Sequence, residues 1–269
     1  MTIAEIHEAD AAGETAAIYA ELRQELGLPL VNLIWRHFAA LPGVLPWAWS
    51  TVRPVMRSLE VLQGQDRMGQ RLWQLAGDMA PALPTLTADQ AAVVDIYNRG
   101  NTTNLQLLTA LRKAMAGQAA GGGGLLERQS GAPAPLASVP GMPRLDRLEP
   151  ETSLMVRKLA ALHGEEGARA IPSLYRHLAL WPDLLPPLHA ALSKVSETGL
   201  LADGRSVLID MADATAARLL PALRPPGVFP AEQREATLGA LEAFTGRLIA
   251  DLSVVGLLLR RPTPVRHLR

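Results

Sequence analysis

An internal repeat constrains the fold of this chain more than any other feature. Residues 35–46 read WRHFAALPGVLP, and residues 175–186 read YRHLALWPDLLP. Six of these twelve positions are identical, where ordinary composition would give about one by chance. Residues 97–113 also align with residues 244–260 in the same helical phase. Two such long units are too few for a solenoid, so the sequence predicts a duplicated pair packed about a pseudo-two-fold axis.

A segment rich in glycine, proline and alanine separates the two copies. It contains four consecutive glycines at 121–124 and the run GAPAP at 131–135. Glycine loses the most entropy on ordering, and proline cannot continue a helix. We therefore predict a first helical repeat at 1–117, a flexible linker at 118–147 and a second helical repeat at 148–269. The two repeats are called the first half and the second half below.

The local sequence signals are helical in both halves. Residues 87–90 read TADQ, a capping box that predicts a long helix ending near Ala116. Pro230 is expected to open the counterpart helix, which is predicted to run to about Arg260 before a proline stops it. We find no alternating β-branched run that would make a strand. The predicted fold class is all-α, with two tandem sequence-related bundles forming a pseudo-dimer.

Charge and composition exclude several classes of function. Lys+Arg and Asp+Glu both number 26, so nothing indicates the basic face that a nucleic-acid partner requires. The chain has no cysteine, which excludes disulfides, thiolate nucleophiles and Cys-based zinc sites and fits a reducing cytoplasm. The N-terminus does not resemble a signal peptide. The longest apolar stretch, residues 248–259, is too short to span a bilayer, so we predict no membrane partner.

Three asparagines in the long first-half helix are candidates for a site. Asn98, Asn101 and Asn104 lie at i, i+3 and i+6, with Gly100 between them. Asparagine is a poor helix former, and a central glycine costs about 1 kcal/mol relative to alanine. These residues either hold a water or polarise a ligand, or they form a kinked and solvated stretch. The aligned second-half residues are Thr245, Leu248 and Asp251, so the polarity differs between the halves.

Histidines and carboxylates are the other candidates for proton transfer. His37 and His177 are repeat equivalents, each preceded by an arginine, and they form either a symmetric polar site or the polar edge of a helix. Asp183 is expected to cap a helix, and Asp203, which precedes a glycine, is expected in a turn. Asp251 lies in an apolar helix, where a buried carboxylate must be paired or have a raised pKa. It is therefore a candidate base.

Three phrases of the sequence resemble one enzyme family. They are LPGVLPWAW at 41–49, YNRGN at 97–101 and SLYRHLALWP at 173–182. They are similar to the group I 2-haloacid dehalogenases, which act on both D and L enantiomers. The resemblance implies an all-α pseudo-dimer with its site between the halves, and it suggests a homodimer. It also implies a reaction without cofactor or metal, in which an activated water attacks the Cα of a small carboxylic acid and expels halide.

The resemblance also implies site residues. Asn98 or Asn101 matches the asparagine that orients the water in that family. The family's aspartate is expected directly after Ser173, where this chain has Leu174, and leucine cannot accept a proton. Family aromatics are expected near Leu30 and Leu33, which are leucines here.

Two functions follow from these departures. The first is hydrolysis of a small 2-halo acid, with a replacement base such as Asp251 and with Leu30, Leu33, Ser173 and Leu174 on the substrate side. The second is a catalytically altered relative that binds a small hydrophobic acid or serves as an interaction scaffold.

Overall fold

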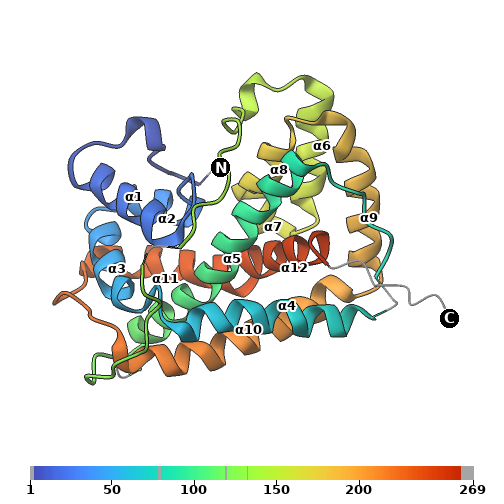
Figure 1. Cartoon of the computed structure of the whole chain (residues 1–269). Coiled ribbons are helices and arrows are strands. Elements are labelled where there is room, and N and C mark those ends of the chain that lie inside the picture. The colour runs from blue at the N-terminus through green and yellow to red at the C-terminus, as the bar shows by residue number, and fades with distance from the viewer. Residues whose placement is uncertain (1–2, 78–79, 119, 132, 262–269) are drawn as a thin grey trace.

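The regular structure of the protein is helical throughout the part that is described. A computed structural model describes residues 3–77, 80–118, 120–131 and 133–261. Within these ranges there is no β-strand, and the only β-type pairing is an isolated bridge between Ser58 and Arg128. The prediction of an all-α class is confirmed (Figure 1).

The principal helices follow the same order in both halves. Those of the first half are α1 (Gly13–Leu26), α2 (Leu33–Ala39), α3 (Val44–Val52), α4 (Leu59–Ala76) and α5 (Ala88–Met115). Those of the second half are α6 (Pro150–Ala161), α7 (Gly164–Ala170), α8 (Ser173–Leu178), α9 (Leu185–Glu197), α10 (Leu200–Leu219), α11 (Arg234–Ala243) and α12 (Ile249–Leu259). A π-helical turn, η8 (Phe244–Leu248), joins α11 to α12, so these three elements form one continuous counterpart of α5.

Two helices form the centre of the molecule. Helix α5 begins at the predicted capping box, in which the Thr87 hydroxyl accepts from the Gln90 backbone N–H and the Gln90 side chain accepts from the Thr87 N–H. Residues 100–111 of α5 and 249–258 of α12 are all buried. The two helices pack on each other and on α10, with α4 alongside (Figure 1). A helix buried on every side needs partners around it, and here both halves supply them.

Asp203 and Gly204 do not form the turn that the sequence predicted. Both lie inside α10. A Cβ on Gly204 would lie 2.9 Å from Leu72 Cδ1 and 3.1 Å from a Val254 methyl group. The glycine therefore allows α10 to approach α4 and α12 closely, and this tertiary requirement overrides the local turn preference.

The linker residues that are described lie against both halves. The Glu127 carbonyl accepts from the Leu59 N–H, and the Leu136 N–H donates to the Gly27 carbonyl. On the other side, the Gly124 N–H donates to the Pro221 carbonyl. The segment between the halves thus contacts helices from each of them.

The two halves make equivalent contacts between their aromatic and polar residues. In the first half, Trp35 Nε1 donates to Asn104 Oδ1 over 3.0 Å. Their aligned residues in the second half are Tyr175 and Asp251, and these are joined through His163. One direct hydrogen bond therefore links α2 to α5 in the first half. In the second half, a chain of three residues links the equivalent helices α8 and α12. This correspondence supports the proposed duplication.

The buried Asp251 carboxylate connects α12 to α10 and to the residue before α7 through polar contacts. It accepts from Arg205 at 2.8 Å, lies 3.2 Å from His163 Nδ1 and lies 3.8 Å from Arg247 Nε. His163 Nε2 lies 2.6 Å from the Tyr175 hydroxyl. A buried charge is tolerated when it is paired and hydrogen-bonded, and Asp251 meets both conditions.

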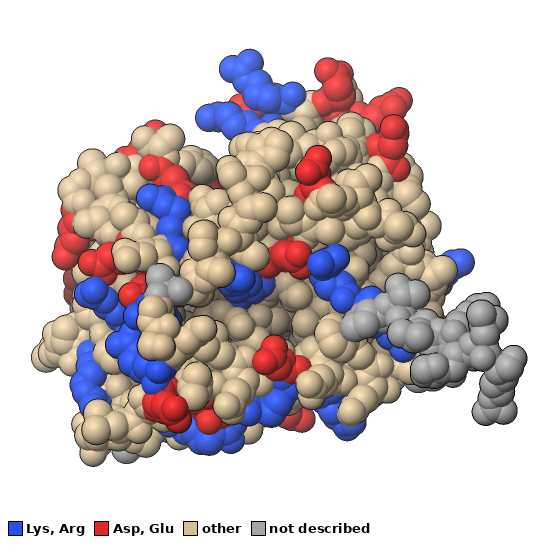
Figure 2. All heavy atoms as spheres, in the orientation of Figure 1, with Lys and Arg blue, Asp and Glu red and all other residues tan. Residues whose placement is uncertain are grey.

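The molecular surface fits the balanced charge of the sequence. Figure 2 shows acidic and basic side chains next to one another over much of the face seen. Among the described residues, no helix combines the length and the apolar character needed to cross a membrane.

We predict that Asp251→Asn lowers the free energy of unfolding by about 3 kcal/mol, because Arg205 would lose a buried partner. Urea unfolding followed by circular dichroism measures this. Asp203→Asn is the matched control, because Asp203 is exposed on α10, and it should change stability by less than about 0.5 kcal/mol. Equal effects of the two substitutions would contradict the assigned role of Asp251.

Candidate functional site

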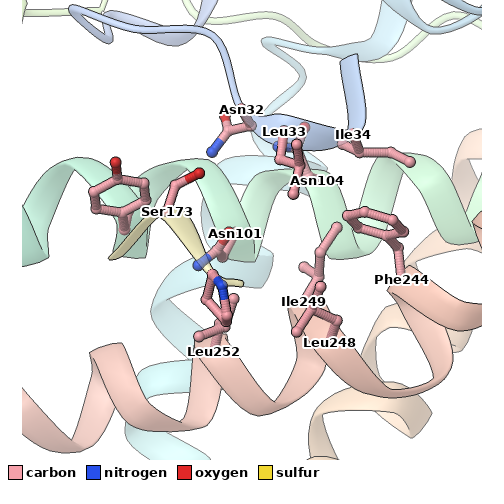
Figure 3. A pocket seen from close by; sticks show the side chains of 12 residues that line it. Asn32, Leu33, Ile34, Asn101, Asn104, Ser173, Phe244, Leu248, Ile249 and Leu252 are labelled. Carbon is pink, nitrogen blue, oxygen red and sulfur yellow. The ribbon is translucent and has the colours of Figure 1, made fainter. Parts of the chain in front are cut away.

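A small pocket lies where the two halves meet. It has a volume of about 30 Å³ and is lined by twelve residues. They come from α2, α5, α8, η8 and α12 and from the residues that directly precede α2 and α8. The lining residues with polar groups are Asn32, Tyr97, Asn101, Asn104 and Ser173. The others are Leu33, Ile34, Pro172, Phe244, Leu248, Ile249 and Leu252. In Figure 3, Asn32, Ser173 and Asn101 surround one side of this space, while Phe244 and Ile249 lie on the other.

Repeat-equivalent positions of the two halves line the same pocket. Leu33 aligns with Ser173, and Asn101 aligns with Leu248, and all four residues line it. Tyr97 and its aligned residue Phe244 do so as well. The same structural positions of both halves thus build the pocket, but helix α5 contributes amides where its counterpart contributes hydrocarbon.

Three amide groups reach the pocket with unused hydrogen-bonding capacity. Asn101 Nδ2, Asn104 Nδ2 and Asn32 Oδ1 are buried and have no hydrogen-bond partner within the described part of the chain. A buried amide atom without a partner costs about 1–3 kcal/mol. Polar atoms left unsatisfied around a cavity mark the place where a polar ligand or water would bind.

Neighbouring residues fix these amides in place. Because the Trp35 indole N–H can only donate, it holds Asn104 Oδ1 and leaves Asn104 Nδ2 for the pocket. A Cβ on Gly100 would lie 2.6 Å from Asn32 Nδ2, so the glycine in the middle of α5 makes room for the Asn32 side chain. Gly100 therefore permits a close approach between α5 and the Asn32 side chain.

Asn98 lies outside the pocket. Its Oδ1 is buried against α12, where a Cβ on Gly256 would lie 3.1 Å from it. Of the two asparagines predicted as catalytic, the structure brings Asn101 to the pocket and directs Asn98 to a helix contact.

Asp251 also lies away from the pocket and is not brought together with the asparagines. It is not among the lining residues, and both of its oxygens contact other side chains, one the guanidinium of Arg205 and the other the imidazole of His163. Its position in the second half corresponds to that of Asn104 in the first.

The four predicted substrate-side residues divide into two groups. Leu33 and Ser173 line the pocket. Leu174 is a buried residue of the hydrophobic core, and Leu30 is partly buried and packs against that core. The Ser173 hydroxyl accepts from Arg36 Nη2 at 3.5 Å. Arg36 is itself buried and forms an ion pair with Glu5 at 2.6 Å. Its guanidinium therefore contacts the pocket through the Ser173 hydroxyl, and the Glu5 carboxylate balances its charge.

Unusual backbone conformations border the pocket on the second-half side. Ile171 has φ of +42°, a value rarely adopted by a β-branched residue, and it directly precedes Pro172 and Ser173. The π-helical turn supplies Phe244 and Leu248. Both conformations are uncommon and are found most often at functional sites.

Sequence reasoning missed Asn32, Tyr97 and Phe244 as pocket residues. Asn32 lies in a connection and becomes part of the site only through Gly100, so no local pattern identifies it. Tyr97 and Phe244 begin the aligned segments 97–113 and 244–260. A search for aligned aromatic pairs within these two segments would have identified both.

A larger cleft adjoins the pocket. It has a volume of about 860 Å³ and shares Leu33 with the pocket. Its lining includes the four arginines Arg144, Arg157, Arg169 and Arg176, together with three carboxylates, Glu5, Asp10 and Asp146. An anion approaching the pocket from solvent through this cleft would meet several guanidinium groups.

The fold and the site together define an all-helical protein with a small amide-lined pocket between two related halves. Solved structures with this fold are D-2-haloacid dehalogenases. A mutant in complex with D-2-CPA has a TM-score of 0.80 and 21% identity, and the enzyme in complex with L-LA has a TM-score of 0.79 and 20% identity. Each alignment covers 96% of this chain and 95% of the other.

Sequence comparison gives the same relationship. The chain is 26% identical over 195 residues to a configuration-inverting 2-haloacid dehalogenase of Alcaligenes xylosoxydans xylosoxydans, and 25% identical over 193 residues to one of Pseudomonas sp. (strain 113). These alignments span 65% and 61% of the length of those enzymes. No family model matches the chain. The chain is therefore a distant relative of the configuration-inverting 2-haloacid dehalogenases.

We predict unequal stability effects for substitutions at two pocket asparagines one helical turn apart. Asn104→Leu should lower the free energy of unfolding by about 2 kcal/mol, because the buried Trp35 N–H loses its acceptor. Asn101→Leu, which introduces the residue found at the aligned position 248, should change it by less than about 1 kcal/mol, because its Nδ2 has no partner to lose. Denaturant unfolding of the two variants measures the difference, and equal losses would contradict the assigned contacts.

Proposed function

We propose that this protein hydrolyses a short 2-halo acid by direct attack of a pocket-bound water on the substrate Cα. The carbon–halogen bond breaks as the new carbon–oxygen bond forms, and no ester is made with the protein. The product is the 2-hydroxy acid of inverted configuration. The distant relationship to configuration-inverting 2-haloacid dehalogenases supports this reaction class.

The observation that carries the proposal is the set of unpartnered amide atoms in the pocket. Asn101 Nδ2 and Asn104 Nδ2 are donors that a substrate oxygen or a departing halide would satisfy, and Asn32 Oδ1 is an acceptor for a water. Donors that are already aimed at developing negative charge stabilise a transition state without further reorganisation. A pocket built only for packing would have no use for these three groups.

The rest of the lining suits a small acid with an alkyl end. Ser173, held by Arg36, lies where a carboxylate would find a donor, while Leu252 and Ile249 supply an apolar wall. The volume of about 30 Å³ holds about two water-sized groups. A 2-halo acid of two or three carbons has five or six non-hydrogen atoms, so the lining side chains must move apart to admit even the shortest substrate, and longer acids are disfavoured further.

Asp251 has no part in this proposal. A general base must lie within hydrogen-bond reach of the water it activates, and the Asp251 oxygens are already bound to Arg205 and His163. The position after Ser173, where the resemblance expects an aspartate, is the buried Leu174.

A second function is binding of a short hydrophobic acid without turnover. The observation that favours it is that none of the twelve described lining residues carries a carboxylate. The same amides and the same apolar wall would hold the ligand in this case, and the missing base would explain the lack of chemistry.

Halide release from racemic 2-chloropropionate tests the proposal. We predict chloride release at neutral to alkaline pH, with one labelled oxygen entering the product during a single turnover in ¹⁸O-water. Asn101→Leu should lower kcat/KM by about 100-fold or more while the protein remains folded.

Absence of chloride release over that pH range would contradict the hydrolytic proposal. Thermal stabilisation by 2-chloropropionate in the wild type, lost in Asn101→Leu, would then support the binding function. A ligand present at 100 times its Kd adds about 2.7 kcal/mol to the free energy of unfolding.

A further inference from the structure

Tyr97 is the one lining residue of the pocket with an ionisable side chain among the twelve that are described. Its hydroxyl lies 3.2 Å from His177 Nδ1 and 3.9 Å from the sulfur of Met142. Met142 lines the adjoining cleft. Tyr97 therefore lines the pocket, contacts a residue of the cleft and is hydrogen-bonded to His177.

The hydrogen bonds around His177 determine which of its nitrogens carries the proton. His177 Nε2 lies 2.7 Å from the Pro140 carbonyl oxygen. A carbonyl can only accept, so Nε2 must carry a hydrogen. In the neutral ring Nδ1 then has a free lone pair, and the Tyr97 hydroxyl donates to it. This leaves the lone pairs of the Tyr97 oxygen available to a further donor.

Burial favours the neutral form of both partners. It lowers the pKa of His177, and the hydrogen bond to Pro140 opposes this shift only in part. Burial also raises the pKa of the Tyr97 hydroxyl, and this effect exceeds the lowering by the positive charges of Arg36 and Arg176. At neutral pH the pair is therefore a tyrosine that donates to an imidazole able to accept a proton.

We propose that Tyr97 and His177 together take the proton of the attacking water, in place of the carboxylate that the pocket lacks. This inference rests on the proposed hydrolysis. The water oxygen bonds to Cα, the carbon–halogen bond breaks, and its electron pair leaves with the halide. The water proton passes to the Tyr97 oxygen as the Tyr97 proton passes to His177 Nδ1. The imidazolium later returns its proton to solvent through the same hydroxyl and the cleft.

The two residues have different roles in this step. Tyr97 lines the pocket and is the catalytic residue, whereas His177 acts through it. The geometry also explains why His177 differs from its repeat equivalent His37. His37 Nδ1 lies 2.7 Å from the Ala4 carbonyl, so this nitrogen must carry a hydrogen and cannot accept a proton. His37 therefore serves as a matched control.

The charges around the pair determine the expected pH dependence. Those that act on Tyr97 are Arg36 from α2, Arg176 from α8 and Glu8 from the N-terminal segment. Glu5 and Arg144 act on Arg176. The imidazole must be neutral to accept the proton, so kcat/KM should fall as the pH drops through the pKa of His177. This acid limb should lie below pH 6.5, because burial lowers that pKa from its ordinary value of 6.5.

Kinetics of halide release in Tyr97→Phe, His177→Gln and His37→Gln test the relay. We expect Tyr97→Phe and His177→Gln to lower kcat by about 100-fold or more, with KM changing by less than about threefold. The acid limb of the wild type should disappear in His177→Gln. His37→Gln should keep wild-type rates and the wild-type pH profile.

Nitrogen NMR of the histidine rings in the wild type gives a second measurement that does not require the variants to fold. His177 should carry its proton on Nε2 and should titrate below pH 6.5. A proton on Nδ1 of the neutral ring would overturn the proposal.

The kinetic outcomes separate this inference from the proposed function. If the wild type releases halide and Tyr97→Phe or His177→Gln does so at the wild-type rate, the relay is wrong and the hydrolytic function stands. If the wild type releases none, the hydrolytic function is wrong and the relay falls with it.

Discussion

Helix α5 is buried on every side between Gly100 and Leu111, so each polar side chain in that stretch must find its partner inside the protein. The hydroxyls of Thr102 and Thr109 donate to carbonyls one turn earlier in the same helix. Asn101 and Asn104 each keep an amide nitrogen without a partner, and both residues line the pocket. The location and polarity of the site follow from this one helix, because its counterpart α12 presents hydrocarbon to the same space.

The two halves, which are related in sequence, contribute different chemical groups to the pocket. Equivalent positions line the pocket, but the first half has Asn101 and Tyr97 where the second half has Leu248 and Phe244. The result is a cavity with amides from the first half, and with apolar side chains and the Ser173 hydroxyl from the second. A small acid with a charged end and an alkyl end needs such an asymmetric cavity, and a strictly symmetric pair of halves would not provide one.

The sequence predicted the features that depend on local chemistry. The capping box at Thr87 starts α5, and the helical class is confirmed. The choice between Asn98 and Asn101 could not be made, because residues three apart on a helix differ in direction by about 60° and the position of α12 decides which one faces the pocket. The turn predicted at Gly204 was wrong for a similar reason. This glycine lies inside α10, and its close approach to Leu72 of α4 is a tertiary contact that the local sequence does not show. Asn32 had no local signal at all.

The central claim is that the amide of Asn101 faces a ligand-binding pocket, whereas that of Asn98, one turn earlier, does not. The most direct test is NMR of the side-chain amide groups, assigned with single-asparagine variants, during titration with 2-chloropropionate. The account predicts a saturable shift of the Asn101 amide resonances with little change at Asn98. Shifts at Asn98 alone, or none at either residue at saturating concentrations, would contradict it.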